Sequence, residues 1–119
     1  MSDEFLKVAT KEINDELTGI SKILGSCNSD EDVFKNSAEI ERHMHKIKGL
    51  APMMGKENVG SLAKSLDVIL KKIAAGQKVD GFFGPLLTSV SEMKIAMEKS
   101  HDLSQAQKEI SNISSTIAD

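Results

Sequence analysis

Apolar residues recur at spacings of three and four through most of this chain of 119 residues. That spacing places them on one face of an α-helix, because the helix turns by about 100° per residue. The clearest stripe, in an unbroken pattern of four and three, contains Val33, Ser37, Ile40, Met44, Ile47, Ala51 and Met54. Such stripes predict helices over residues 3–24, 30–54, 57–75, 82–99 and 103–117. No segment shows convincing strand alternation.

The connections between these helices are short, and glycine or proline marks several of them. Gly25, Gly55 and Gly76 each fall where a stripe stops, and glycine commonly ends a helix. Pro52 lies in the last turn of the second helix, where its missing N–H predicts a bend or a loosened turn. Short connections make neighbouring helices antiparallel. The sequence therefore predicts one all-α domain over residues 1–119, an up-and-down antiparallel four-helix bundle with a fifth C-terminal helix.

Composition narrows the classes of function. The net charge of −3 argues against a nucleic-acid surface. No apolar run approaches the ~20 residues of a membrane span. Cys27 is the only cysteine, so no internal disulfide can form. The chain begins Met-Ser-Asp-Glu, without the basic and apolar regions of a signal peptide, so a cytoplasmic location is expected.

His45 lies off the apolar stripe of the second helix. It is about 130° from the centre of the stripe, so its ring should face solvent. Lys48, three residues on, shares this flank, and its ammonium group can reach an oxygen of a phosphoryl group on the imidazole. Gly49, four residues on, lets a partner approach the ring. Glu41, four residues back, can accept a hydrogen bond from one ring nitrogen and leave the other as the nucleophile.

Each of these features also has an ordinary explanation. An exposed histidine needs no function. Lys48 can simply be solvated, and Gly49 can permit close packing of helices. Glu41 can pair with Arg42 or with Lys48. It is the combination around one outward-facing imidazole that predicts a reactive site.

The third predicted helix supplies candidates for the surroundings of His45. In an antiparallel helical hairpin whose turn is centred near Lys56, residues equally far from the turn lie opposite each other on the two helices. His45 is eleven residues before Lys56, and Asp67 is eleven after it. Asp67 and Lys64 share a flank off the apolar stripe and are therefore expected near His45, where an acid can raise the basicity of the imidazole. The alternative for Asp67 is an interhelical salt bridge without a chemical role.

A metal site is the main rival interpretation of the histidines. His43 and His45 are two residues apart, so they point about 160° away from each other and cannot chelate one ion on an intact helix. His101 is remote in sequence, and there is no cluster of thiolates. His43 falls nearer the buried flank and is expected to be structural. The sequence thus predicts no metal ligand, which a titration with zinc or copper would check.

Residues 45–55, His-Lys-Ile-Lys-Gly-Leu-Ala-Pro-Met-Met-Gly, resemble the motif of histidine phosphotransfer (HPt) domains. The shared pattern is His, two residues, Lys-Gly, one residue, Ala, three residues and Gly. The likeness is greatest to the N-terminal phosphotransfer domains of the CheA family of chemotaxis kinases, which also have five helices. The family often has a histidine at the place of Lys64 and a glutamate at the place of Asp67, so this chain departs from the pair that tunes the imidazole there.

The resemblance implies a role for each residue of the motif. His45 would be phosphorylated by the ATP-binding domain of a histidine kinase and would pass the phosphoryl group to an aspartate of a response regulator such as CheY or CheB. Lys48 would orient and screen that group, and Gly49 would leave room for the partner. A place within cytoplasmic chemoreceptor arrays follows from the same likeness.

Nothing in the sequence is typical of an ATP site. It has no Gly-rich phosphate loop followed by Lys-Ser or Lys-Thr and no acidic cluster for Mg²⁺. The chain is therefore expected to be a phosphoryl carrier and not an enzyme on its own, with no cofactor of its own and with ATP and Mg²⁺ bound by partner domains. As part of a CheA-type chain it would belong to an ATP-dependent protein histidine kinase. The alternatives are a free-standing phosphorelay protein and a helical interaction module without phosphotransfer.

Overall fold

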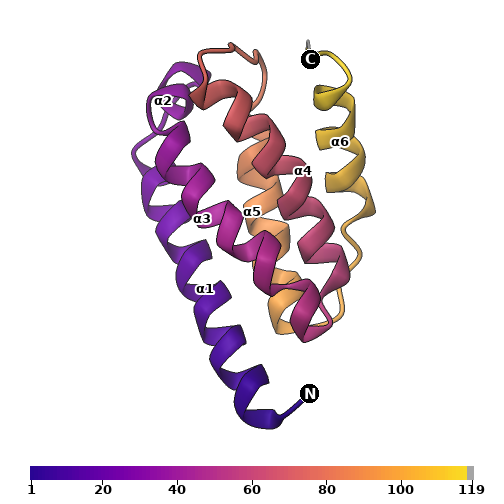
Figure 1. The fold of residues 1–119 in the computed structure, drawn as a ribbon. Helices are drawn as coiled ribbons and strands as arrows, with labels where there is room; N and C mark the ends of the chain where they lie inside the picture. Colours follow the sequence, from indigo (N-terminus) through magenta and orange to yellow (C-terminus); the bar gives the residue numbers. More distant parts are fainter. Residues whose placement is uncertain (118–119) are drawn as a thin grey trace.

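The computed structural model describes residues 1–117, and all of the regular structure in that range is helical (Figure 1). Its elements are α1 (Asp3–Gly25), α2 (Asp30–Lys35), α3 (Ser37–Leu50), the 3₁₀ helix η1 (Pro52–Met54), α4 (Glu57–Ala74), α5 (Phe83–Glu98) and α6 (Ser104–Ser114). No strand occurs among these residues, which confirms the prediction of an all-α fold. None of these helices is both long and apolar enough to cross a membrane.

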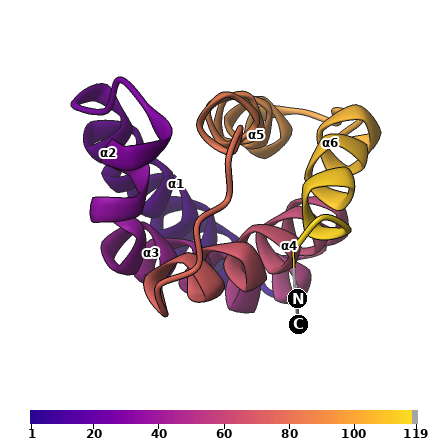
Figure 2. The same cartoon turned by 90° about the horizontal axis from the view of Figure 1, so that it is seen from above.

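The helices form a bundle around one apolar core. α3 packs against α4 and α1, α5 contacts α1 and α6, and α6 also lies against α4. Seen along the helices, these five surround the interior, while α2 lies at the end of the bundle where the chain passes from α1 to α3 (Figures 1 and 2). The largest fully buried side chains include Ile13, Ile20, Ile40, Met44, Ile47, Leu62, Leu66 and Phe82.

The stripe predicted for the second helix is the seam by which α3 enters the core. All seven of its residues are buried: Val33, Ser37, Ile40, Met44, Ile47, Ala51 and Met54. Because burial of an apolar face supplies most of the stability of a helix in a bundle, this seam sets the rotation of α3 about its own axis. Positions away from the seam, including His45, are thereby directed outward.

The prediction of one unbroken helix over residues 30–54 is wrong, because the structure has two helices, α2 and α3, before the turn η1. Asn36 separates them. Its side-chain amide donates to the carbonyl of Asp32 at 2.8 Å, and its backbone N–H bonds three residues back instead of four. The hydroxyl of Ser37 donates to the carbonyl of Phe34 at 2.8 Å. Polar side chains thus occupy carbonyls that a continuous helix would pair with backbone N–H groups.

At the other end of α3, the bend predicted at Pro52 is confirmed. The α-helix ends at Leu50, and residues Pro52–Met54 form η1. Proline has no N–H to donate to the carbonyl of Lys48, so regular α-helical bonding stops there. Gly55 then adopts a left-handed conformation with φ of 87°, which glycine takes without the strain that a side chain would add.

The other predicted helices agree with the structure to within one residue at each end, except the last. α6 begins at Ser104 and ends at Ser114, whereas the stripe predicted a helix as far as residue 117. The hydroxyl groups of Ser115 and Thr116 donate to carbonyls three residues back, both at 2.7 Å. These side chains compete with the backbone for the acceptors that would extend the helix.

Gly60 allows α4 to approach the turn at Pro52. A Cβ atom at position 60 would lie 2.6 Å from Cγ and 2.8 Å from Cδ of Pro52, and a proline ring cannot swing aside. Gly60→Ala should therefore lower the free energy of unfolding by about 1–3 kcal/mol, as overpacking does, in urea denaturation. Gly25→Ala is the control, because a Cβ atom there meets nothing within 4 Å. Equal stability of the two variants would contradict the steric explanation.

Candidate functional site

His45 lies on the outer side of α3, where the rotation of the helix directs it. Its side chain is 54% exposed, whereas the neighbouring seam residues Met44 and Ile47 are fully buried. Side chains of a helix lean toward its N-terminus, so the His45 ring covers the turn that contains Glu41 and Arg42. The imidazole is thus accessible to a partner while its backbone is held by the core.

Asp67 of α4 is the nearest carboxylate to His45. Its Oδ2 atom lies 3.3 Å from Nδ1 of His45. The side chain is only 2% exposed, and Leu66 and Leu70 beside it on α4 are fully buried. Asp67 therefore lies opposite His45, as the register of the hairpin predicts.

Two ammonium groups bind the same oxygen of Asp67. Nζ of Lys48 on α3 and Nζ of Lys71 on α4 each lie 3.1 Å from Oδ2. Burial by itself raises the pKa of Asp67, but hydrogen bonds from Glu41, from the two lysines and from His45 outweigh it and lower the pKa to about 2. Asp67 is therefore ionised at neutral pH and holds two cations beside the imidazole.

Glu41 belongs to the same cluster, but the predicted hydrogen bond between Glu41 and His45 is wrong. Oε2 of Glu41 lies 3.7 Å from Nδ1 of His45, which is beyond hydrogen-bond length and farther than Asp67. Glu41 instead acts with Asp67, since hydrogen bonding between the two carboxyl groups, burial and the negative charge of Asp67 raise the pKa of Glu41. The two carboxyl groups thus differ in role, because Asp67 is held ionised and Glu41 is shifted toward its protonated form.

Lys64, which was predicted near His45, makes no contact among the described residues that would place it in the site. Lys64 is exposed, and within residues 1–117 no hydrogen bond or ion pair joins it to His45 or Asp67. Because helical side chains lean toward the N-terminus, Lys64 extends away from Asp67. Lys71, four residues beyond Asp67, leans back over it. The sequence shows that Lys64 and Lys71 share one flank, and the lean of helical side chains is the signal that would have selected Lys71.

Gly49 is not required by the packing of the described helices. A Cβ atom at this position would meet nothing within 4 Å, in contrast to Gly60. Gly49 borders a hollow of about 570 Å³ next to His45, which is also lined by Glu12, Lys46, Lys48, Leu50 and Met53. Met53 is 63% exposed, so the hollow also offers apolar surface. Close packing of helices therefore does not explain this glycine, while access by a partner remains a prediction.

His43 makes a structural contact with α1, in keeping with its place nearer the buried flank. Its Nδ1 atom lies 2.7 Å from Oε1 of Glu16, which is itself buried. Gly19 provides the space for the ring, because a Cβ atom there would lie 2.7 Å from Cε1 of His43. The two histidines of α3 thus face different helices. The pattern that could have indicated this contact is an acid and a glycine three residues apart on α1.

Glu41, His45 and Asp67 are the residues of this site that could offer ligands to a metal ion. One ligand atom from each lies within 4.8 Å of the others. However, the ammonium groups of Lys48 and Lys71 already bind Oδ2 of Asp67, and the raised pKa of Glu41 opposes its ionisation. Two cations therefore already stand beside the carboxylate that a metal ion would need, so the electrostatics of the site favour an anion.

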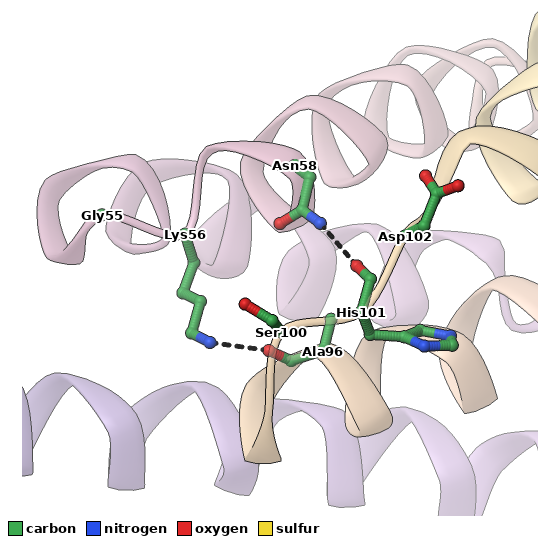
Figure 3. Close-up of a pocket in the computed structure, with 7 residues that line it drawn as sticks. All are labelled: Gly55, Lys56, Asn58, Ala96, Ser100, His101 and Asp102. Atoms are coloured by element: carbon green, nitrogen blue, oxygen red, sulfur yellow. Dashed lines mark hydrogen bonds between the residues drawn. The ribbon is translucent and has the colours of Figure 1, made fainter.

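A separate hollow of about 490 Å³ lies where the beginning of α4 meets the connection between α5 and α6 (Figure 3). Nζ of Lys56 donates to the carbonyl of Ala96 at 2.8 Å. Nδ2 of Asn58 donates to the carbonyl of His101 at 2.9 Å. Figure 3 shows Lys56, just before α4, reaching the last turn of α5, and Asn58 of α4 reaching the α5–α6 connection. The two bonds thus tie the end of α5 and the connection to the beginning of α4. None of the residues around His45 lines this hollow.

Geometry therefore singles out the cluster of His45, Glu41, Asp67, Lys48 and Lys71 as the candidate site. Comparison of the chain with protein-family models, with curated proteins and with solved structures found no match in any of the three.

Proposed function

We propose that this chain is a histidine phosphotransfer module in which His45 carries the phosphoryl group. The observation that supports it most directly is the distance of 3.3 Å between Nδ1 of the exposed His45 and the buried carboxylate of Asp67. An ionised carboxylate only accepts hydrogen bonds, so Nδ1 carries the proton. Nε2 then keeps its lone pair and is the nucleophile.

His45 and ATP supply every atom and electron that the first step rearranges. Nε2 of His45 attacks the γ-phosphorus of ATP on a partner kinase domain. A P–N bond forms, the bond to the bridging oxygen breaks, and its electron pair leaves with ADP. The proton stays on Nδ1, where Asp67 offsets the positive charge that the ring gains. In the second step an aspartate of a response regulator attacks the phosphorus, and the P–N bond breaks.

The same proposal covers the architecture and the partners. In it, α1, α3, α4 and α5 are the up-and-down antiparallel four-helix bundle and α6 is the appended helix, which the packing of α3 between α1 and α4 supports. The chain is a carrier and a substrate and not an enzyme on its own, and ATP and Mg²⁺ belong to the kinase domain. Its partners are that domain and regulators such as CheY or CheB in the cytoplasm.

Phosphate transfer from labelled ATP, in the presence of the ATP-binding domain of a CheA-type kinase, tests the proposal. The wild type is expected to gain acid-labile phosphate, and His45→Gln to gain none. His101→Gln is the matched control, because His101 also contacts a carboxyl group, that of Glu92 at 3.1 Å. Equal labelling of the wild type and His45→Gln would refute the carrier role. A wild type that neither this kinase nor phosphoramidate can label would favour an interaction module.

Lys48→Ala should slow phosphorylation of His45 about tenfold while the helices stay folded. Its ammonium group carries a charge-assisted hydrogen bond to the site, and such bonds contribute about 1.5–3 kcal/mol. Asp67 keeps Lys71 as a partner, so the fold tolerates the change. Initial rates measure the first effect and circular dichroism the second, with Lys64→Ala as the control for lost charge. Parallel losses of helicity and activity would instead give Lys48 a structural role.

A further inference from the structure

Arg42 is the only arginine of the chain and lies on α3, three residues before His45. Its side chain is exposed, and no hydrogen bond or ion pair within residues 1–117 involves its guanidinium group. The other cations near His45 all have a carboxylate partner: Lys46 contacts Glu16, and Lys48 and Lys71 contact Asp67. Arg42 is thus the unpaired cation among the described residues around the imidazole.

Arg42 lines a hollow of about 290 Å³ beside the imidazole, together with Glu41, His45, Lys46 and Lys71. α3 contributes Arg42 and Lys46 to it and α4 contributes Lys71, and of these three cations only Arg42 has no carboxylate partner among the described residues. Glu41 is the only acid among these lining residues, and its pKa is raised by its hydrogen bond to Asp67 and by burial. The charge of the hollow is therefore suited to a dianion.

We propose that this hollow is an oxyanion site for the phosphoryl group on His45 and that Arg42 binds the phosphoryl oxygens there. The inference rests on the proposed carrier function, because it assumes that His45 is phosphorylated. The His45 ring covers the turn of α3 that bears Arg42, so a group on the ring lies within reach of that long side chain. A guanidinium group can donate two parallel hydrogen bonds to phosphate oxygens, which an ammonium group cannot. Arg42 orients the phosphoryl group, and Lys71 forms the facing wall from α4.

The single arginine makes a direct test possible, because its Nε–H group gives one signal in a ¹H–¹⁵N spectrum. The full chain is treated with potassium phosphoramidate, which phosphorylates histidine without a kinase, and ³¹P spectra report the phosphohistidine. We expect the Arg42 signal to move when His45 is phosphorylated, and to stay in place in His45→Gln treated in the same way. A phosphorylated wild type with an unmoved Arg42 signal would overturn the oxyanion site. If the wild type forms no phosphohistidine, the carrier function fails, and the inference fails with it.

Rates of phosphorylation by phosphoramidate give an independent measurement. Arg42→Gln is expected to react about tenfold more slowly than the wild type, because the charge-assisted hydrogen bonds are lost. Arg42→Lys should recover part of the rate, since it restores the charge without the paired donors. Lys64→Gln removes the same charge from an exposed site outside the hollow and should stay within about twofold of the wild type. If Arg42→Gln and Lys64→Gln react equally fast, general charge accounts for the effect and Arg42 has no specific role.

Discussion

Replacing Asp67 with asparagine is expected to slow phosphorylation of His45 by about 100-fold, because hydrogen bonds to charged groups contribute about 1.5–3 kcal/mol. Asparagine has nearly the shape of aspartate but no charge, so its amide oxygen accepts more weakly from Nδ1–H of His45 and cannot offset the positive charge of the reacting ring. The two lysines at Oδ2, Lys48 and Lys71, also lose their shared anion. Initial rates with a kinase domain and with phosphoramidate measure the loss.

Two further variants separate this tuning of the imidazole from a general loss of structure. Asp67→Glu keeps the charge on a longer side chain and should retain much more activity than Asp67→Asn. Glu41→Gln removes the neighbouring carboxyl, which lies farther from Nδ1 of His45, and should have the smaller effect on rate. An unchanged rate in Asp67→Asn would show that Asp67 serves only as an interhelical salt bridge.

The same carboxylate should make stability depend on pH. The pKa of Asp67 is about 2 in the fold, against an ordinary value of 3.8. Because the pKa is lowered, Asp67 stabilises the fold above pH 3.8, and this contribution is lost as the pH falls from about 4 toward 2. It is about 2 kcal/mol, since one pKa unit corresponds to about 1.4 kcal/mol. The difference in unfolding free energy between wild type and Asp67→Asn should therefore shrink over that range in urea denaturation.

Glu41 also makes the unfolding free energy depend on pH, but in the opposite direction. Its pKa is raised in the fold, chiefly by the hydrogen bond with Asp67, so its favourable contribution is present at low pH and is lost as the pH rises through the raised pKa. In Glu41→Gln the unfolding free energy should no longer fall as the pH rises through the pKa of Glu41. The loss of stability below about pH 4 that comes from Asp67 should remain. If the difference in unfolding free energy between wild type and Asp67→Asn stays constant down to pH 2, the lowered pKa of Asp67 is contradicted.

Gly49→Gln is expected to stabilise the chain while it reduces phosphotransfer to a partner at least tenfold. Glutamine is a better helix former than glycine by up to about 1 kcal/mol, and a Cβ atom at position 49 meets nothing within 4 Å. The new side chain extends into the hollow beside His45 that a partner would enter. Denaturation measures the first effect, and transfer from the kinase domain or to a response regulator measures the second.

Gly25→Gln is the matched control for this variant. Gly25 is also exposed and in a helix, α1, with nothing within 4 Å of a Cβ atom, but it lies outside the site. Transfer should be normal in Gly25→Gln, and phosphoramidate, which is too small to be excluded, should label Gly49→Gln at nearly the normal rate. Normal transfer to partners by Gly49→Gln would show that the open space at Gly49 does not serve partner access.

Most of the helical fold could be predicted from the sequence, because helical periodicity is a local property that each stripe displays by itself. The break at Asn36 could not, since the stripe runs from Val33 through Ser37 to Ile40 without changing its spacing. Only the hydrogen bonds of two polar side chains interrupt the backbone there. The turn at Pro52 was predictable, because a missing N–H has the same effect in any surroundings.

The outward direction of His45 and the places of Lys48 and Gly49 beside it follow from the sequence alone, because one helix relates these residues through a fixed turn per residue. Which groups of α4 meet the imidazole depends on how the helices pack. The hairpin brings Asp67 to Nδ1, and the lean of helical side chains adds Lys71 and turns Lys64 away. These contacts depend on the register and rotation of two helices, where a shift of one residue turns a side chain by about 100°. The packing also shows that the space beside Gly49 is open, which no spacing along the chain reveals.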